Sequence, residues 1–306
     1  MIHDRFAMIG ESLVDVIVDG SGGLTTRAGG SPMNVAIGAA RLGLNTALIT
    51  AYGHDDHGAL VQQHIESEGV TLINRGDPRR PTNQAVATLA ADGSAEYAFH
   101  MENQVRGAAD AIVGSDLAHL HVGSITAVSD GEWADVLAAV ESSRDTATIS
   151  YDPNCRPDLG IPIAEGRRRA EKFVGVADLV KASDEDLTWL YPEQTADAVA
   201  ARWMDAGARL VVITHGEEGP IGYAEGVRVS VPASRTHVTD TVGAGDSFMA
   251  AMLAWCDERG MLGRSRLPRF SADEVRGMLE FAARASAITC ARVGANPPTR
   301  AELERN

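Results

Sequence analysis

The sequence predicts an α/β fold in which helices cover both faces of a mostly parallel sheet. Short apolar segments alternate with amphipathic helical patterns along the chain, and such alternation implies right-handed crossovers between parallel strands. A length of 306 residues with 44% hydrophobic content allows a large core. We therefore expect one domain over residues 1–306 with a small flap attached.

The strands expected in the main sheet are short apolar runs bounded by turn or capping residues. In chain order they are residues 6–10, 46–52, 119–123, 147–152, 178–181 and 210–214. Helices are expected between them, and two are predicted to begin at capping boxes, Ser129 with Glu132 and Ser271 with Glu274. In such a sheet, ligands bind beyond the carboxyl ends of the strands.

A small second sheet is expected where this alternation breaks. Segments 83–89 and 94–101 flank Ala91-Asp92-Gly93, and an Asp-Gly step between alternating segments predicts a hairpin. Segment 14–18 is a further strand candidate, followed by a glycine-rich stretch. The insertions 12–28 and 83–104 would form a lid over a substrate site, and an ordinary excursion or dimer contact is the alternative.

The charge and lysine content exclude several function classes. The formal net charge of −15 argues against nucleic acid and membrane partners, since both require clustered Lys and Arg. Lys172 and Lys181 are the sole lysines, and no Gly-Lys-Ser or Gly-Lys-Thr tripeptide occurs, which excludes a Walker-type loop. No Gly-x-Gly-x-x-Gly run follows the first strand, which disfavours a dinucleotide-binding oxidoreductase.

The cysteines indicate a reducing compartment. Cys155, Cys256 and Cys290 are scattered and odd in number, which argues against a disulfide framework and a zinc site. The amino-terminal residues lack a signal-peptide pattern, and no run of about 18 apolar residues could span a membrane. We expect a cytoplasmic protein.

Two histidine groups resemble metal sites without meeting their requirements. Residues 54–57 combine two histidines with two aspartates, but consecutive residues cannot all face one ion, and Asp55 with Gly58 fits a strand-to-helix turn. His119 and His121 alternate on one strand face, where hydrogen-bonded structural histidines are commoner than a ligand pair. We favour structural roles for both groups.

The most informative motif is residues 240–248, Asp-Thr-Val-Gly-Ala-Gly-Asp-Ser-Phe. Apolar residues recur on one helix face after it, and Gly260 is a suitable stop. The first N–H groups of a helix lack internal partners and lie at its positive end, so residues 243–246 can hold an anion. Asp246 can then take a proton from a hydroxyl that attacks a phosphate. An ordinary helix N-cap is the alternative.

A second glycine cluster, residues 28–36, precedes a helix in which Pro32 suits the first turn. Together with Gly43, the turn 53–58 and residues 240–248, it resembles both signatures of the ribokinase family of sugar kinases, also called PfkB-type carbohydrate kinases. The resemblance extends over almost the whole chain. It implies a three-layer ribokinase-like fold with a small β-sheet lid, and transfer of the ATP γ-phosphate to a primary hydroxyl.

The same resemblance assigns roles around the transferring phosphate and the sugar. Asp246 matches the catalytic base, and the backbone of Gly243, Ala244 and Gly245 matches the anion hole, which suits a reaction that needs positioning and charge stabilisation. The residues implied to bind the sugar are Asp15, Gly29, Gly30 and Asn34. From the residues alone, Asp15 could equally be an exposed strand residue and Asn34 a cap or turn amide.

Two further residues are candidates for sugar binding. Phe99 lies on the lid segment, and its ring suits the apolar face of a sugar. Arg156 follows a strand and matches a family loop near the active site, where its planar fork can bind a substrate oxygen or a phosphate. A surface arginine is the alternative.

The nucleotide contacts are implied in the same way. They are assigned to Thr214, Gly216 and Gly219, which resemble a turn beside ATP, and to Asn296 near the adenine. Lys181 either reaches a phosphate or is a surface ammonium group.

Ser183 and Asp186 replace the usual Asn and Glu of a family motif. Asp186 can hold Mg²⁺ through water, or the pair can simply cap an acidic helix terminus. Asp240 matches an acid that binds a monovalent cation, which suggests K⁺.

The substrate expected is fructose, because residues 10–15 resemble the start of bacterial fructokinases more than that of ribokinases. Ribose, 2-keto-3-deoxygluconate and a nucleoside are the alternatives. An acid sugar would require a cationic lid, where Arg106 is the nearest candidate, and a nucleoside would require an aromatic clamp from a chain with 5% aromatic residues. A catalytically silent sugar-binding regulator is the alternative of a different class. Exposed lid edges also suggest a homodimer.

Overall fold

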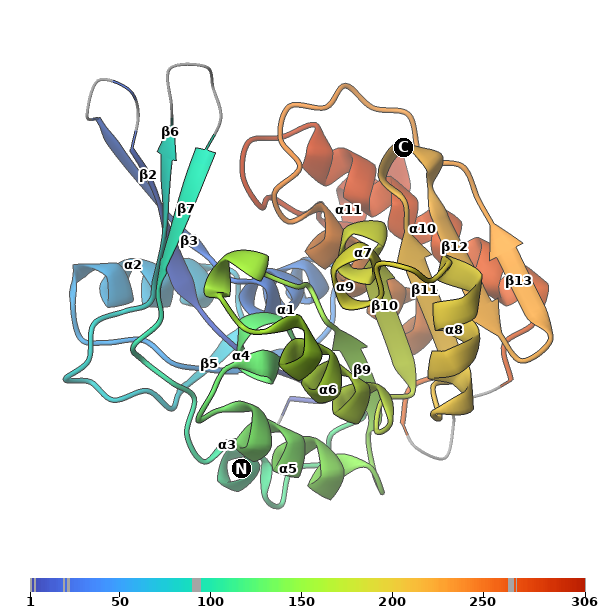
Figure 1. The fold of residues 1–306 in the computed structure, drawn as a ribbon, viewed down its shortest axis with the longest axis horizontal. Helices are drawn as coiled ribbons and strands as arrows, with labels where there is room; N and C mark the ends of the chain where they lie inside the picture. Colours follow the sequence, from blue (N-terminus) through green and yellow to red (C-terminus); the bar gives the residue numbers. More distant parts are fainter. Residues whose placement is uncertain are drawn as a thin grey trace.

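The computed structural model describes residues 2, 4–18, 20, 23–89, 95–263, 267 and 269–305. A nine-stranded sheet lies between two layers of helices, and a four-stranded sheet projects from one side of it (Figure 1). The predicted α/β architecture with a second, smaller sheet is therefore confirmed. Among the described residues, no helix has the length and apolar character needed to cross a membrane.

The main sheet has the strand order β13-β12-β11-β10-β9-β8-β1-β4-β5. Its strands are β1 (Phe6–Ile9), β4 (Thr46–Thr50), β5 (Thr71–Asn74), β8 (His119–Gly123), β9 (Thr148–Asp152), β10 (Leu179–Ser183), β11 (Leu210–Thr214), β12 (Pro220–Ala224) and β13 (Val227–Ser230). Neighbours from β5 to β11 are parallel, whereas β12 is antiparallel to β11 and to β13. All strands expected from the sequence are present, whereas β5, β12 and β13 were not predicted.

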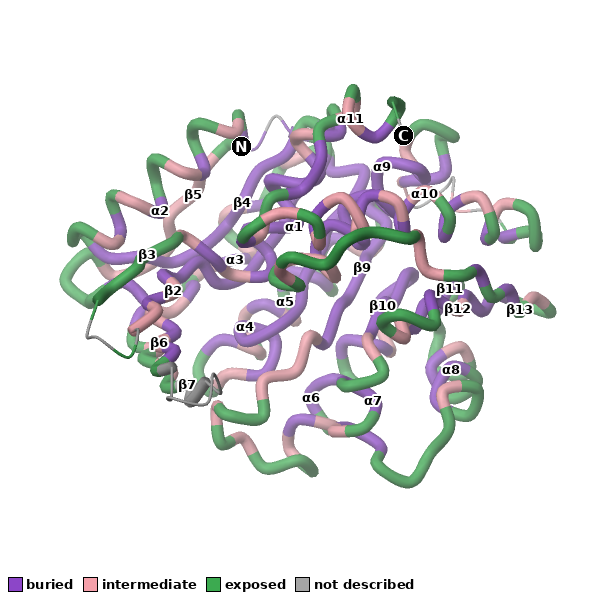
Figure 2. Tube along the Cα trace, turned by 90° about the horizontal axis from the view of Figure 1, so that it is seen from above, coloured by how far each residue is buried: buried purple, intermediate pink, exposed green. Residues whose placement is uncertain are grey.

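Helices cover the sheet on both faces because its strands are apolar on both sides. Phe6 and Met8 of β1 pack into one core cluster, whereas Ala7 and Ile9 pack into the other. The first cluster includes residues of α1 (Ser31–Arg41), α2 (Asp56–Ser67), α9 (Ala244–Glu258), α10 (Ala272–Cys290) and α11 (Arg300–Arg305). The second includes residues of α3 (Ala108–Ile112), α4 (Ser124–Val128), α5 (Trp133–Ser143), α6 (Ile163–Val174), α7 (Asp184–Leu190) and α8 (Ala196–Asp205). Figure 2 shows the buried strands between helices that are exposed on their outer faces.

The small sheet has the order β3-β2-β6-β7. It consists of β2 (Leu13–Val18), β3 (Leu24–Gly29), β6 (Gln84–Leu89) and β7 (Ala95–His100). Strand β3 was not predicted, because its residues are mostly exposed and include no apolar run. The expected hairpin strands β6 and β7 pair antiparallel, but their turn at residues 91–93 lies outside the described residues.

A reciprocal amide pair holds the base of the small sheet. The Asn83 side chain donates to the Asn103 carbonyl at 2.8 Å and accepts from the Asn103 N–H at 2.9 Å. Asn103 in turn accepts from the N–H of Asp77 at 2.9 Å. The two chain segments that enter and leave the β6–β7 hairpin are thereby joined to each other and to the main body.

The two predicted capping boxes have different outcomes. Ser271 and Glu274 form the expected box at the start of α10. The box at Ser129 was wrong, since α5 begins four residues later at Trp133 and Ser129 ends α4. The Glu132 carboxylate instead accepts from the N–H of Val105 at 2.7 Å, a partner distant in the sequence.

The chain order locates the crevice where ligands are expected. From β1 the chain adds β4 and β5 on one side and later β8 to β11 on the other. Such a reversal places a crevice beyond the carboxyl ends of β1 and β8. Strands β2 and β3 follow β1 directly, so the small sheet rises beside this crevice (Figure 1).

Candidate active site

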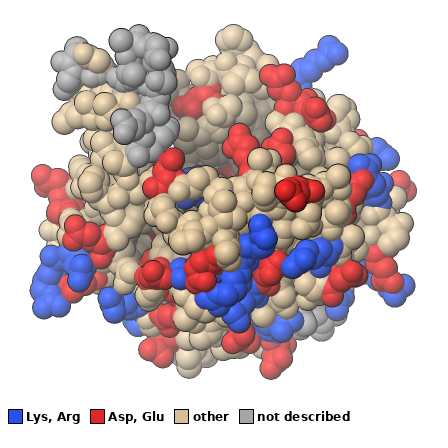
Figure 3. All heavy atoms as spheres, viewed as in Figure 1, with Lys and Arg blue, Asp and Glu red and all other residues tan. Residues whose placement is uncertain are grey.

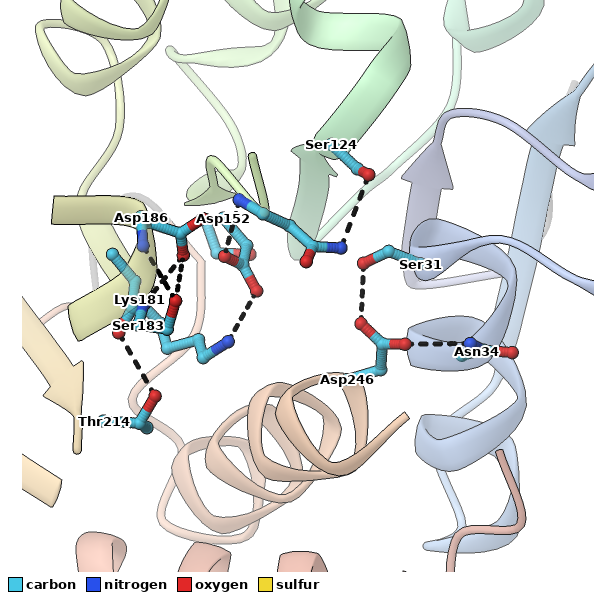
Figure 4. Close-up of polar contacts among 12 residues, drawn as sticks. Ser31, Asn34, Ser124, Asp152, Lys181, Ser183, Asp186, Thr214 and Asp246 are labelled. Atoms are coloured by element: carbon cyan, nitrogen blue, oxygen red, sulfur yellow. Dashed lines mark hydrogen bonds and ion pairs between the residues drawn. The ribbon is translucent and has the colours of Figure 1, made fainter. Parts of the chain in front are cut away.

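Asp246 lies in the first turn of α9, where two side chains of α1 bind its carboxylate. The Ser31 hydroxyl donates to Oδ1 at 2.6 Å and the Asn34 amide donates to Oδ2 at 2.8 Å. Both side chains point at Asp246 from the neighbouring helix (Figure 4). Asp246 is 8% exposed, so its carboxylate is held in one orientation, as a general base requires.

The packing of α1 on α9 explains this geometry. A Cβ atom on Gly38 would come within 2.8 Å of the Ala250 Cβ, so a glycine permits the close approach of the two helices. Gly38 follows Asn34 and Ala250 follows Asp246 by one helical turn. The helices therefore run side by side in the same direction, and the positive ends of both dipoles face one region.

The turn before α9 depends on Gly243. Its φ of +75° lies in the left-handed region that favours glycine, and a Cβ there would come within 2.6 Å of the Ala295 Cβ. The Ala244 N–H donates to the Thr241 carbonyl at 3.2 Å, so an anion would compete with that bond. The amides of Gly245 and Asp246 follow in the first turn of the helix.

Lys181 is buried beside this turn, so the prediction that it could be a surface ammonium was wrong. Its side chain is 5% exposed, and its Nζ lies 2.9 Å from Asp152 Oδ2. Burial lowers the pKa of Lys181, but the charges of Asp152 and Asp186 outweigh this effect and raise it. A Cβ on Gly245 would lie 2.8 Å from Nζ, so a charged ammonium group faces the start of α9.

Ser183 and Asp186 form a capping box at the start of α7. The Ser183 hydroxyl accepts from the Asp186 N–H at 3.0 Å, and Asp186 Oδ2 accepts from the Ser183 N–H at 2.7 Å. Asp186 Oδ1 accepts from the Cys155 N–H at 2.6 Å. Both carboxylate oxygens thus have a backbone donor, and each keeps a further lone pair that could accept from a water molecule on an ion.

Asp15 lies on the small sheet between two arginines. It is opposite Arg27 in the β2–β3 register. Burial raises the pKa of Asp15 to about 6, whereas the charges of Arg156 and Arg27 lower it. A Cβ on Gly29 would overlap Asp15 Oδ2, so the glycine leaves room for this carboxylate beside the predicted sugar site.

Arg156 lies in the loop after β9, and Phe99 lies on β7 of the small sheet. Arg156 Nη1 donates to Asn154 Oδ1 at 2.8 Å and to the Cys155 carbonyl at 2.9 Å. Asn154 is one of two described non-glycine residues with positive φ, at +39°. The other is Ser124, the first residue of α4, and the Asn154 amide donates to its hydroxyl at 3.4 Å. Phe99 is partly buried against Leu13 and Ile125.

The residues assigned to the nucleotide follow β10 and β11 or lie near the end of the chain. Thr214 ends β11, and its hydroxyl donates to the Ala182 carbonyl at 3.4 Å. Gly216 begins a short 3₁₀ turn that ends at Gly219. Asp240 accepts from the N–H groups of Val242 at 3.0 Å and Gly294 at 2.8 Å. Asn296 accepts from Arg41 at 2.6 Å, so its side-chain oxygen is engaged within the protein.

Three polar residues near the site had no role assigned from the sequence. Ser31 stands inside the first glycine signature, and Asp152 precedes the Arg156 loop. Glu11 is buried, accepts from the Thr126 N–H at 3.2 Å and hydroxyl at 3.0 Å, and has a pKa raised by burial. For Glu11 after β1 and Asp152 at the end of β9, the position at a carboxyl end of the sheet was the available signal, since ligands gather there.

The histidines take structural positions. His119 Nε2 and His121 Nδ1 each lie 2.8 Å from the Ser150 hydroxyl, and burial lowers the pKa of both imidazoles to about 3. Asp55 caps α2 by accepting from the Gly58 N–H at 2.8 Å. The three cysteines are free.

The surface is recessed between the small sheet and the main body, with acidic side chains at the edge of the recess (Figure 3). The proposed base, Lys181 and the start of α9 lie on the main body, whereas Asp15 lies on the small sheet. The arrangement combines a base, a buried cation and a helix terminus, which are the groups needed to move a phosphoryl group to a hydroxyl.

The sequence and the fold are similar to those of known proteins. The model of the pfkB family carbohydrate kinases matches residues 5–302. The chain is 36% identical over 255 residues to a fructokinase of Rhizobium leguminosarum bv. trifolii, which covers 80% of this chain and 77% of that one. It is 31% identical over 319 residues to probable fructokinase-4 of Arabidopsis thaliana, covering 96% and 94% of the two chains.

Solved structures show the same fold. The crystal structure of a fructokinase from Xylella fastidiosa superposes with a TM-score of 0.85 at 24% identity, covering 99% of this chain and 98% of that chain. A fructokinase from Vibrio cholerae O395, in a form with fructose, ADP and calcium ion bound, superposes with a TM-score of 0.82 at 25% identity and the same coverage.

Proposed function

The chain belongs to the pfkB family of carbohydrate kinases and is an ATP-dependent sugar phosphotransferase, and from that premise we propose that it phosphorylates fructose. The relatives named fructokinase support this choice, at 36% identity for the bacterial protein. The observation that carries the reaction type is the carboxylate of Asp246, held by two donors at the first turn of α9.

In the proposed reaction, Asp246 accepts the proton of a primary hydroxyl as that oxygen bonds to the γ-phosphorus of ATP. The bond from the γ-phosphorus to the bridging oxygen breaks, and ADP leaves with its electron pair. The amides of Gly243, Ala244 and Gly245 bind the oxygens of the phosphoryl group during transfer. Lys181, charged and facing the start of α9, adds a positive charge at that point.

The sugar is proposed to bind between the small sheet and the main body. Asp15 accepts from sugar hydroxyls, and Arg156 donates to a sugar oxygen. Gly29 and Gly30 leave space for the ring, and Phe99 packs on its apolar face. The small sheet then acts as a lid, which excludes water from the reacting atoms. Pairing of two lids across their exposed edges is the proposed route to a homodimer.

Mg²⁺ and K⁺ are proposed cofactors that accompany ATP. Asp186 would hold Mg²⁺ through water, since its side chain is shorter than the glutamate usual at this position, and Asp240 would contribute to a K⁺ site. When bound, Mg²⁺ neutralises charge on the ATP phosphates. Thr214, Gly216, Gly219 and Asn296 would border the nucleotide, with Ser183 acting through its capping of α7. A cytoplasmic location is proposed from the free cysteines.

The test is a coupled ADP-release assay with ATP and Mg²⁺ over fructose, ribose, 2-keto-3-deoxygluconate and nucleosides. We expect the highest kcat/KM with fructose. Asp246→Asn should lower kcat by about 10²- to 10⁴-fold, whereas the control Asp257→Asn, near the far end of the same helix, should not. Absence of turnover with every acceptor, despite ATP binding, would contradict the proposal and favour a silent sugar-binding regulator.

A further inference from the structure

Ser31 binds Asp246 but has no assigned role in the proposed reaction. It occupies the first position of α1 after the N-cap Gly30 and is 7% exposed. Its hydroxyl lies 2.6 Å from Asp246 Oδ1, and both groups are buried. A hydrogen bond of this length between a hydroxyl and a carboxylate belongs to the strong, charge-assisted class.

The two partners of Asp246 differ in what they can do. The Asn34 Nδ2 group, 2.8 Å from Oδ2, can only donate a hydrogen bond. The Ser31 hydroxyl can donate through its hydrogen and can also accept through its oxygen. Once the carboxylate gains a proton, Ser31 can therefore accept a hydrogen bond from it, whereas the Asn34 Nδ2 group cannot.

We propose that Ser31 is a positioning residue for the catalytic base, which donates to Oδ1 of Asp246 before phosphoryl transfer and accepts a hydrogen bond from the protonated carboxyl afterwards. This inference rests on the proposed function. The proton leaves the sugar hydroxyl as its oxygen bonds to phosphorus, and it resides on Oδ1, while ADP departs with the electrons of the broken bond. The Ser31 hydroxyl turns about its Cβ–Oγ bond, so no heavy atom has to move.

The packing of α1 and α9 keeps this contact in place. The Gly38–Ala250 approach, one turn beyond the Asn34–Asp246 pair, fixes the register of the two helices. A rigid pair of helices with a rotatable hydroxyl between them suits a group that must bind both protonation states of one carboxylate. Such positioning acts on kcat rather than on substrate binding.

Ser247 offers a matched control for Ser31. It is also a buried serine, 2% exposed, and it is the next residue after the base. Among the described residues its hydroxyl has no hydrogen-bond partner. Removing that hydroxyl should therefore leave turnover near the wild-type value, although the two serines are similarly buried.

The experiment compares Ser31→Ala, Ser31→Thr and Ser247→Ala with the wild type by steady-state kinetics, with circular dichroism melts to compare their folding. We expect Ser31→Ala to lower kcat by about 10- to 100-fold and to leave both KM values within about twofold. Ser31→Thr, which keeps a hydroxyl, should recover most of that loss. Ser247→Ala should stay within about twofold of wild type.

The inference is overturned by a Ser31→Ala kcat within twofold of wild type, by a loss confined to KM, or by a Ser31→Thr variant that folds but is as slow as Ser31→Ala. These outcomes differ from failure of the proposed function, in which the wild type itself turns over no sugar. A melting midpoint that falls equally in Ser31→Ala and Ser247→Ala, with equal losses of kcat, would also overturn it, since the role would then be structural.

Discussion

Lys181 and Asp152 form an ion pair on adjacent strands, with Nζ and Oδ2 2.9 Å apart and side chains 5% and 1% exposed. Strands β10 and β9 run parallel, so both side chains leave the sheet near the same carboxyl edge (Figure 4). The pair places a cation beside the start of α9 at the cost of burying two charges.

Lys181→Met should both destabilise the protein and raise the KM for ATP. It leaves the buried Asp152 carboxylate without its partner, which costs about 3–5 kcal/mol of unfolding free energy in urea titrations. Loss of a charge-assisted phosphate contact should raise the KM for ATP by about 10-fold or more. The double variant Lys181→Met, Asp152→Asn should regain most of the stability but not the ATP affinity. Recovery of both would contradict a phosphate contact for Lys181.

Alanine at Gly243 and at Gly245 should have different effects. At Gly243, alanine must adopt a φ of +75° and meets the backbone of Ala295 at 2.9 Å, so we expect a loss of about 1–3 kcal/mol and impaired activity. At Gly245, the new Cβ meets the movable end of Lys181. That variant should melt near the wild-type temperature yet show a raised KM for ATP. Equal melting temperatures for both variants would refute the assigned role of the Gly243 turn.

The KM for the sugar should fall as the pH rises through about 6. The pKa of Asp15 is raised to about 6 by burial, and only the ionised carboxylate can accept freely from sugar hydroxyls. Arg27→Gln should move the midpoint upward, because the charge of Arg27 lowers this pKa. Asp15→Asn should flatten the profile and raise the KM. A sugar KM that is constant between about pH 5 and 8 would show that Asp15 does not bind the substrate.

Glu132 should make the fold less stable as the pH rises. Burial, helped by the charge of Glu11, raises the pKa of Glu132 from its ordinary value of 4.5 to about 8. The folded protein therefore holds a proton that the unfolded chain releases, so the unfolding free energy decreases between these two pH values. Glu132→Gln keeps an acceptor for the Val105 N–H and should reduce this slope in urea titrations at pH 5 to 8. An unchanged slope would indicate that Glu132 is ionised in the folded state.

Local patterns predicted most of the fold. The predicted apolar runs 46–52, 119–123 and 210–214 form strands that end at Thr50, Gly123 and Thr214, within two residues of the expected ends. Burial on both faces requires continuous hydrophobic residues. Strand β3 was missed because its residues are held by pairing with β2 rather than by burial. The false capping box at Ser129 had the correct spacing, but Glu132 binds Val105, which no local pattern reveals.

The site was predicted less completely than the fold, because side-chain partners are distant in the sequence. The glycine signatures located Asp246 and Asn34, but not that these two residues bind each other. From the sequence, Lys181 could either bind a phosphate or lie at the surface. Only the register of β9 and β10 places Asp152 beside it. Ser31 carried no signal of its own, since its relation to Asp246 depends on the packing of two helices.

The proposed site is divided between the small sheet and the main body, and this division affects the hydrolysis of ATP in the absence of a sugar. Asp15 rises with the small sheet, whereas the proposed base remains in the main body beneath it. A sugar carries enough hydroxyls to contact both at once, and a water molecule does not. On the proposed site, the acceptor half is incomplete until a sugar contacts both parts, so we expect hydrolysis of ATP by water to be slow without any separate inhibitory element.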